Sequence, residues 1–259
     1  MKKSIIRLGV LLLAALGITA HAITGVTHTP STPYGWYFVP NNTGTTPLLD
    51  PGMKFAEEHG GYYCDHRCEG SEKVIYLTFD AGYENGNVEK IVDALDAHGA
   101  HGSFFILENL IKRNPELVQR MHDGGHAVCN HTCRHHDMTK SSREEFESEL
   151  RGLEEQYTAL TGDELTMCYR PPEGRFTEQN LDWATELGYK TVFWSYAYAD
   201  WDNDNQPDPE KSVEKIIAHT HPGMIILLHP TSATNAAIMD TLLTRWEEMG
   251  YSFRTVGEL

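Results

Sequence analysis

Hydrophobic and polar positions alternate along this chain in blocks that predict a regular succession of β-strands and α-helices. Short apolar runs have the length of buried strands, and longer segments with one apolar face lie between them. The strands are expected at Val74–Phe79, Gly102–Ile106, His126–Asn130, Met167–Arg170, Thr191–Trp194, Gly223–Leu228 and Ser252–Val256. The helices are expected at Val88–His98, Lys112–Asp123, Ser142–Thr161, Thr177–Leu187, Pro209–His219 and Asn235–Met249.

Local signals support several of these boundaries. Ser142 and Glu145 fit a capping box, and glycines stand at 124, 125, 188 and 250, where helices should end. The β-α alternation predicts an α/β fold of parallel strands with right-handed crossovers, either an open sheet or a barrel. The repeat count, roughly seven, falls just short of the eight units of a complete β/α barrel.

The beginning of the chain has a different character. Residues 1–22 combine a basic start, an apolar run too short for a comfortable membrane span, and the small-x-small pattern Ala20-His21-Ala22. This pattern predicts a secretory signal peptide cut after Ala22, with an uncleaved membrane anchor as the alternative. Residues 23–70 are rich in Pro, Gly, Thr and aromatic residues and predict an extended arm, with one short helix near Met53–His59. The aromatic residues of Tyr34–Pro40 either pack on the main domain, residues 71–259, or line a sugar site.

The net charge of the chain limits the classes of partner that it is expected to bind. The formal net charge is −16, and loss of Lys2, Lys3 and Arg7 with the signal peptide would make it more negative still. Phosphate binding needs Lys and Arg patches, so we expect no nucleic-acid partner and no charge-driven docking on an anionic membrane. A neutral, hydroxyl-rich glycan fits this charge better.

The chain has five cysteines, at positions 64, 68, 129, 133 and 168. An odd number in an exported protein leaves at least one thiol free or paired between molecules. Cys64 and Cys68 could form a local disulfide, remain free thiols or contribute to a metal site, although no second pair follows at the spacing of a structural zinc site.

Residues capable of chemistry follow the carboxyl ends of the predicted strands. In parallel α/β proteins these ends meet on one rim, where catalytic groups collect. Asp80 ends the run Val74–Phe79 and is expected to be a catalytic base, although a turn-forming Asp at a strand end is the simpler alternative. The rim residues that follow the other strands include His131, His135, Arg170, Trp194, Asp200, Trp201 and His229.

Spacing suggests a role for several of these residues. His131 and His135 are four positions apart, so on a helical turn both rings would face one divalent metal ion. Arg170 precedes two prolines that fix the backbone, and its guanidinium could keep Asp80 ionised. His229 suits a general acid, with Asp200 to orient it and raise its pKa.

These segments together resemble the polysaccharide deacetylases with a NodB-homology domain, which form carbohydrate esterase family four. The resemblance rests on Thr78-Phe79-Asp80, His131-Thr132-x-x-His135, Arg170-Pro171-Pro172-x-Gly174, Asp200-Trp201 and Leu228-His229. Within that family, residues 76–86, 191–201 and the arm at 34–40 look most like the delta-lactam-biosynthetic de-N-acetylases. Those enzymes remove the acetyl group of muramic acid in peptidoglycan, so that the freed amine can close a lactam of the spore cortex.

The resemblance implies a distorted (β/α)7 barrel and assigns roles on the rim. Asp80 corresponds to the base, His131 and His135 to the metal ligands, Arg170 to the residue that tunes the base, His229 to the acid and Asp200 to the partner of that acid. Substrate contacts are expected from Tyr83, Pro172, Trp194, Trp201 and Leu228. Most of the family has a metal-binding Asp directly after the base, and Ala81 stands there instead, as is usual in the delta-lactam group.

The expected function is therefore that of an exported peptidoglycan de-N-acetylase, associated with the cell wall and acting by metal-assisted acid–base catalysis. Zinc is the expected ion, with magnesium, manganese or cobalt as alternatives. The expected partner is the peptidoglycan glycan strand, and the protein is expected to be a monomer without a stable membrane anchor after signal cleavage. Three alternatives stay open: a deacetylase for N-acetylglucosamine, chitin or xylan, a catalytically silent wall-binding protein, and a two-His metallopeptidase. The last lacks a His-Glu-x-x-His helix.

Overall fold

The computed structural model describes residues 31–70 and 72–259. The expected signal peptide, residues 1–22, lies outside this range. None of the helices within the described range combines the length and apolar character needed to cross a membrane.

The core of the fold is one large sheet in which every strand pair is parallel. The order of its strands is β2-β8-β6-β5-β4-β3-β10-β9, and β11 pairs with β3 outside this path. The strands of this sheet are β2 (Gly61–Tyr62), β3 (Val74–Ala81), β4 (Ser103–Ile106), β5 (Ala127–Asn130), β6 (Thr166–Tyr169), β8 (Lys190–Val192), β9 (Tyr196–Ala197), β10 (Met224–Leu228) and β11 (Ser252–Arg254). The predicted parallel α/β architecture is confirmed.

One short stretch of chain connects β9, at one end of the sheet, with β8, the second strand from the other end. Strands β8 and β9 are separated by only three residues, and β8 pairs with β6 while β9 pairs with β10. This stretch bends the sheet into a distorted barrel. The sequence did not predict β9, because a two-residue strand is too short to show a hydrophobic period.

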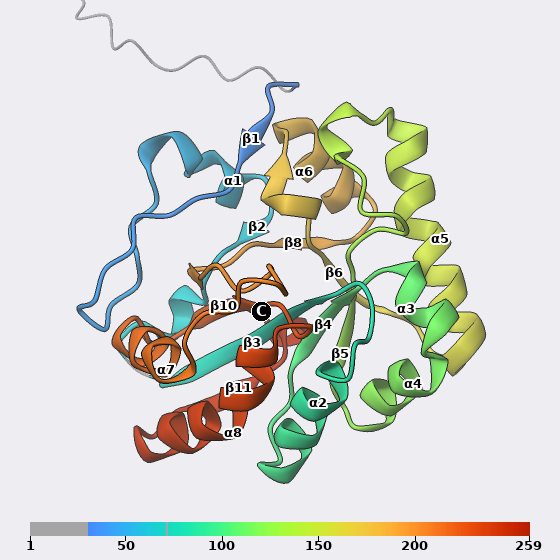
Figure 1. The fold of residues 1–259 in the computed structure, drawn as a ribbon. Helices are drawn as coiled ribbons and strands as arrows, with labels where there is room; N and C mark the ends of the chain where they lie inside the picture. The colour runs from blue at the N-terminus through green and yellow to red at the C-terminus, as the bar shows by residue number, and fades with distance from the viewer. Residues whose placement is uncertain (1–30, 71) are drawn as a thin grey trace, which may run out of the picture.

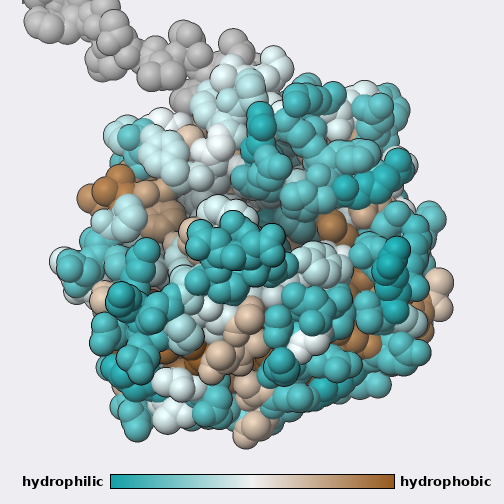
Figure 2. Space-filling model, viewed as in Figure 1, coloured by the Kyte–Doolittle hydropathy of each residue, from teal (hydrophilic) through white to brown (hydrophobic). Residues whose placement is uncertain are grey.

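Helices surround the strands (Figure 1). They are α1 (Phe55–Glu58), α2 (Val88–Ala97), α3 (Glu108–Arg113), α4 (Pro115–Asp123), α5 (Arg143–Thr161), α6 (Glu178–Glu186), α7 (Pro209–Ala218) and α8 (Ala233–Glu248). Ser142 and Glu145 form the predicted capping box at the start of α5. The face of the molecule seen in Figure 2 is mostly hydrophilic, as the acidic composition leads one to expect.

The two faces of β3 have different surroundings, because successive side chains of a strand point to opposite sides. Ile75, Leu77, Phe79 and Ala81 belong to the hydrophobic cluster shared with the surrounding helices. Val74 and Tyr76 belong to a second cluster with Phe105, Val192 and other strand residues. By the same alternation, the Asp80 side chain lies on the face of Val74 and Tyr76. This face is turned toward the other strands and away from the helices.

The predicted helix Lys112–Asp123 is wrong in one respect. The structure has two helices there, with α3 ending at Arg113 and α4 beginning at Pro115. A proline fits the first position of a helix, where its missing N–H is not needed, and it disfavours helical backbone in the residue before it. Asn114 accordingly has non-helical angles, with φ −135° and ψ 54°.

The N-terminal segment is tied to the barrel by aromatic packing and by strand pairing. Trp36 stacks on Phe193 with ring centroids 4.2 Å apart, and its indole N–H donates to the carbonyl of Trp194 at 2.9 Å. Strand β1 (Tyr34–Gly35) pairs with β7 (Arg175–Phe176), and β2 extends the main sheet beside β8. Trp36 is buried, so packing on the main domain is the interpretation that applies to it. Tyr37 is exposed and does not take part in this packing.

Candidate active site

Asp80 lies at the carboxyl end of β3, in the position that the sequence predicted for a base. Its carboxylate Oδ1 accepts a hydrogen bond from Arg170 Nη1 at 2.8 Å, and its Oδ2 lies 3.6 Å from His131 Nε2. Burial alone would raise the pKa of Asp80, but the positive charges of Arg170, His131 and His229 outweigh it and lower the pKa. The side chain is 11% exposed, so an ionised carboxylate still reaches the surface of the rim.

Arg170 is fully buried, and the protein satisfies its guanidinium on several sides. Besides Asp80, it donates to Thr78 Oγ1 at 2.8 Å and to the carbonyls of Val192 at 3.0 Å and Phe193 at 3.3 Å. Its guanidinium carbon lies 4.1 Å from the centre of the Phe105 ring. A buried guanidinium needs such partners, and the planar fork of Arg can serve several acceptors at once. Arg170 therefore holds Asp80 in place and links β3, β6 and β8.

His131 and His135 do lie together, but the predicted helical turn is wrong. Residues 131–137 form a loop after β5, with φ of 72° at Thr132 and 59° at His135. The two rings meet edge to face with centroids 4.9 Å apart. Among described residues, Glu173 in the loop after β6 is the other non-glycine residue with positive φ, at 56°. Such backbone strain tends to collect at functional sites, and here it occurs in two rim loops.

The His131 ring is oriented in the way that metal ligands usually are. Its Nδ1 lies 2.8 Å from the carbonyl oxygen of Arg170, which can only accept, so Nδ1 carries the hydrogen and Nε2 keeps its lone pair. Burial, assisted by the positive charges of His135 and Arg170, lowers the pKa of His131 to about 4, which leaves the ring neutral at physiological pH. The exposed His135 lies beside it, so the two imidazoles fit a divalent ion such as zinc. Ala81 is fully buried in the hydrophobic cluster and offers no third ligand.

His229 follows β10 and is held by Asp200. Its Nδ1 donates to Asp200 Oδ1 at 2.7 Å, and its backbone N–H donates to Asp200 Oδ2 at 2.9 Å. Burial lowers the pKa of His229, but the hydrogen bond to Asp200 and the charges of Asp200 and Asp80 more than compensate and raise it. The ring is 27% exposed, and its Nε2 is not used by the contact with Asp200.

Asn235 is a site residue that the sequence reasoning missed. It lies in the first turn of α8, and its amide donates to Asp200 Oδ2 at 2.6 Å and to the carbonyl of His229 at 3.0 Å. The hydroxyl of Tyr198 donates to its Oδ1. The signal in the sequence was a polar residue on the buried side of an otherwise apolar helix face.

The residues expected to contact substrate occupy two environments. Tyr83 and Trp201 are exposed, and Tyr83 is fixed by a 2.7 Å hydrogen bond from Asn203 to its hydroxyl. The Trp201 ring lies 6.2 Å from the His229 ring. Pro172 and Leu228 are buried, and the half-buried Trp194 packs close to Gly174, so the role of these three in binding stays a prediction.

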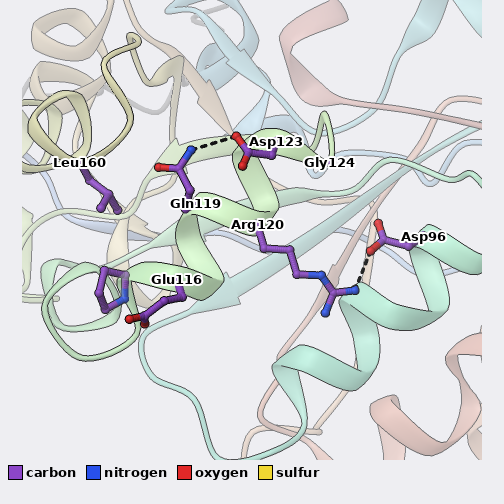
Figure 3. A pocket seen from close by; sticks show the side chains of 8 residues that line it. Asp96, Glu116, Gln119, Arg120, Asp123, Gly124 and Leu160 are labelled. Carbon is purple, nitrogen blue, oxygen red and sulfur yellow. Dashed lines mark hydrogen bonds and ion pairs between the residues drawn. The ribbon is translucent and has the colours of Figure 1, made fainter.

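A hollow of about 800 Å³ lies beside His135, lined also by Arg134, His136, Asp137 and Glu149 among others. It adjoins the rim at His135. A second hollow, of about 720 Å³, lies on the outer helices, where Arg120 pairs with Asp96 (Figure 3). None of the predicted site residues lines this second hollow, so it belongs to the helical surface and not to the rim.

The fold and the rim geometry agree with comparisons to known proteins. Residues 67–192 match the family described as polysaccharide deacetylase. The chain belongs to this family, which is family 4 of the carbohydrate esterases, and is therefore an amide-hydrolysing deacetylase. The family expected from the sequence is confirmed.

Among its relatives is the peptidoglycan-N-acetylmuramic acid deacetylase PdaA of Bacillus subtilis. It is 36% identical over 233 residues, which cover 89% of this chain and 87% of the relative. The structure of PdaA superposes with a TM-score of 0.84 at 35% identity, covering 89% of this chain and 98% of that one.

Two further relatives concern alternatives that the sequence left open, namely N-acetylglucosamine specificity and a catalytically silent protein. A peptidoglycan-N-acetylglucosamine deacetylase of Bacillus cereus is 30% identical over 202 residues, which cover 76% of this chain and 92% of the relative. A family 4 pseudoenzyme from Bacillus anthracis superposes with a TM-score of 0.70 at 25% identity, covering 77% of this chain and 68% of that one.

Proposed function

We propose that this protein is an exported enzyme that hydrolyses the acetamide of N-acetylmuramic acid in peptidoglycan and releases acetate. The observation that carries the proposal is that one rim holds both a carboxylate whose pKa is lowered and an imidazole whose pKa is raised. Asp80 is held by Arg170, His229 is held by Asp200, and the charges of Asp80 and His229 influence each other's pKa. A protein that only binds glycans has no use for such an acid–base pair.

Asp80 acts as the general base. It accepts the proton of the water that attacks the acetyl carbonyl, and Arg170 keeps it ionised and oriented for this task. A backbone N–H of the Gly82–Tyr83 turn can donate to the oxyanion that develops on the carbonyl oxygen.

His229 acts as the general acid. It donates the proton that the departing amine needs, since the C–N bond does not break toward an unprotonated nitrogen. Asp200 holds the ring by Nδ1, so the proton of Nε2 is the one delivered. The exposed rings of Trp201 and Tyr83 flank this site and can support a sugar ring.

His131 and His135 would hold a divalent metal ion, with zinc as the expected species. When bound, such an ion supplies Lewis-acid polarisation of the carbonyl and makes water more acidic. The donor set of two neighbouring imidazoles, one with its Nδ1–H already committed to Arg170, supports this assignment.

Muramic acid is proposed as the substrate because of Ala81 and the similarity to PdaA. The lactyl carboxyl of muramic acid can condense with the amine freed by deacetylation, with loss of one water molecule, to give a delta-lactam of the spore-cortex type. An N-acetylglucosamine specificity is the second candidate, favoured by the Bacillus cereus relative.

Product analysis tests the proposal. The protein without residues 1–22 should release acetate from peptidoglycan, and mass spectrometry should locate the lost acetyl groups on muramic acid. Treatment with a chelator should abolish release, and zinc, cobalt or manganese should restore it. Loss of acetyl groups from glucosamine would establish the second candidate, and glycan binding without acetate release under any metal would support a silent wall-binding protein.

The pH dependence of turnover tests the role of Asp200. His229 must be protonated to act, so kcat falls as the pH rises through its raised pKa. Asp200→Asn removes the charge that raises this pKa, and the alkaline limb of the kcat profile should move to lower pH. The acidic limb, which reports the base, serves as the internal control. An unchanged alkaline limb would assign proton donation to another group.

A further inference from the structure

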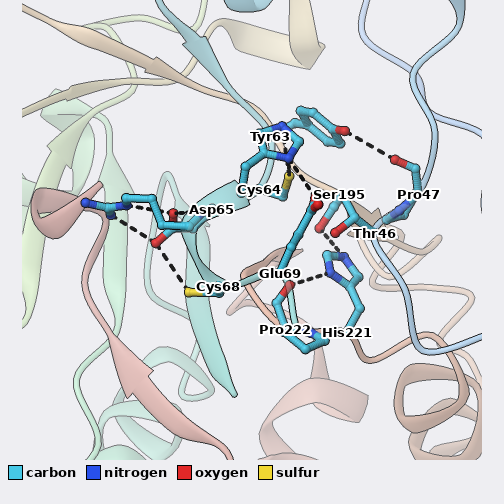
Figure 4. Close-up of polar contacts among 12 residues, drawn as sticks. Thr46, Pro47, Tyr63, Cys64, Asp65, Cys68, Glu69, Ser195, His221 and Pro222 are labelled. Carbon is cyan, nitrogen blue, oxygen red and sulfur yellow. Dashed lines mark hydrogen bonds and ion pairs between the residues drawn. The ribbon is translucent and has the colours of Figure 1, made fainter. Parts of the chain in front are cut away.

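A second group of metal-ligand side chains lies at the other end of the barrel. Cys64, His66 and Glu69 bring one ligand atom each within 4.8 Å of one another, and Asp80, His131 and His135 are not members of this group. Figure 4 shows Cys64 and Glu69 near Tyr63 and Pro47. The mechanism proposed for the rim uses none of these residues.

The location of the group follows from strand pairing. Cys64 forms a β-bridge with Met224, the first residue of β10, and the N–H of Asp65 donates to the carbonyl of Gly223 at 2.8 Å. Gly223 has φ +74°, and a Cβ there would lie 2.2 Å from the carbonyl oxygen of Asp65, so only glycine allows this approach. Asp80 and His229 lie at the opposite, carboxyl ends of β3 and β10.

The distance between sulfur and nitrogen suits a single ion. Cys64 Sγ lies 3.6 Å from His66 Nδ1 and 3.5 Å from Nε2, whereas Glu69 Oε1 lies at hydrogen-bond distance from Nδ1, 2.8 Å, and would move slightly outward on binding an ion. Ligand bonds of zinc in a tetrahedral site place sulfur and nitrogen donors about 3.5 Å apart. Thiolate, imidazole and carboxylate together are a donor set for zinc and not for magnesium or calcium.

Glu57 supplies a second, separate feature of a metal site. Its Oε1 lies 2.8 Å from His66 Nε2, on the side of the ring away from Nδ1. A histidine that binds a metal through one nitrogen commonly donates its other N–H to a carboxylate, which fixes the tautomer. A hollow of about 250 Å³ lined by Glu57, Cys64, His66 and five other residues opens onto the group.

We propose that Cys64, His66 and Glu69 form a structural site for a zinc-like ion, with Glu57 as the carboxylate that orients His66. Binding displaces the thiol proton of Cys64 and any proton on the Nδ1 of His66, and both pass to solvent. The ion would tie helix α1, which carries Glu57, and the 3₁₀ turn His66–Cys68 to the start of β10. It would stabilise the packing of the N-terminal segment without taking part in catalysis.

The competing explanation is an ion triad without metal. In that state a protonated His66 lies between Glu57 and Glu69 and itself supplies the positive charge. The Cys64 thiol is then a neutral, buried group, since burial raises its pKa far above the usual range.

Metal binding distinguishes the two explanations. The protein should bind two zinc ions per chain in equilibrium dialysis followed by elemental analysis, and a His131→Ala/His135→Ala variant should keep one. In that variant, cobalt(II) should give a sulfur-to-cobalt charge-transfer band in the near ultraviolet. Cys64→Ser should remove the band and the ion, whereas Cys68→Ser, which changes a buried thiol that donates to Asp65, should keep both.

A second, more conservative variant tests the site with a smaller change to the packing of the protein. Glu57→Gln keeps the shape of the side chain and should weaken zinc binding about 10- to 100-fold, the usual effect of losing the carboxylate behind a histidine ligand. Zinc should raise the melting temperature of the His131→Ala/His135→Ala variant and not that of its Cys64→Ser derivative.

Zinc binding that disappears entirely with His131 and His135, or a cobalt complex without a thiolate band, would overturn the proposal and establish the ion triad. The count of two ions in the wild type includes the rim ion of the proposed function, but the His131→Ala/His135→Ala variant reports on Cys64, His66 and Glu69 alone. A failure of the rim site therefore leaves the result for this variant unchanged.

Discussion

Replacing Asp80 with asparagine is expected to lower kcat/KM for peptidoglycan deacetylation by at least ~10²-fold, the lower end of what general-base catalysis contributes. An amide has nearly the shape of a carboxylate but cannot take the proton of the attacking water. Its carbonyl oxygen can still accept the hydrogen bond from Arg170 Nη1, so the fold should survive. Acetate release under saturating metal is the measurement, with circular dichroism to verify the fold.

Asp65 provides a matched control for this variant. It is also a buried carboxylate paired with an arginine, since it accepts hydrogen bonds from Arg67 Nε at 2.8 Å and Nη2 at 2.9 Å. It lies at the amino-terminal end of the strands, so Asp65→Asn should cost stability and leave kcat unchanged. Near-normal turnover by Asp80→Asn would refute the assignment of the base.

Replacing Arg170 with methionine is expected to lower the free energy of unfolding by about 3–5 kcal/mol, the usual effect of breaking a buried ion pair from one side. Methionine fills much of the space but leaves Asp80 without its main counter-charge and the carbonyls of Val192 and Phe193 without a donor. Urea denaturation at neutral pH measures the loss.

Two further variants provide reference values for this loss of stability. Arg170→Lys keeps a positive charge near Asp80 but cannot reproduce the planar fork, so its loss should be intermediate. Arg143 pairs with Glu186 on the surface, and Arg143→Met should cost under about 1 kcal/mol. A loss for Arg170→Met as small as that of Arg143→Met would mean that the buried pair contributes little to the fold.

The sequence could predict the rim because parallel strands impose a simple rule. Each strand ends at the same edge, so Asp80, His131, Arg170 and His229 had to converge once the β-α alternation was recognised. The contacts of Asp80 with Arg170 and His131 agree with that expectation.

The remaining details depend on interactions that leave no periodic signal. The loop that brings His131 and His135 together uses positive φ at two positions, which residue spacing cannot indicate. Strands β1, β7 and β9 have two residues each, and their existence depends on partners far away in the chain. Asn235 reaches Asp200 from a helix whose apolar face hid its role.

The position of β3 in the sheet also determines when the protein can fold. The hydroxyl of Thr78 donates to the carbonyl of Ile226, a residue 148 positions later, and β11 pairs with β3 from still nearer the C-terminus. Closing such long loops costs chain entropy before any contact compensates it, and this slows folding. A chain that stops before β10 would keep one edge of β3 unpaired, with backbone groups free to recruit another chain into an aggregate. The strand that carries the base is therefore also the strand most dependent on the complete sequence.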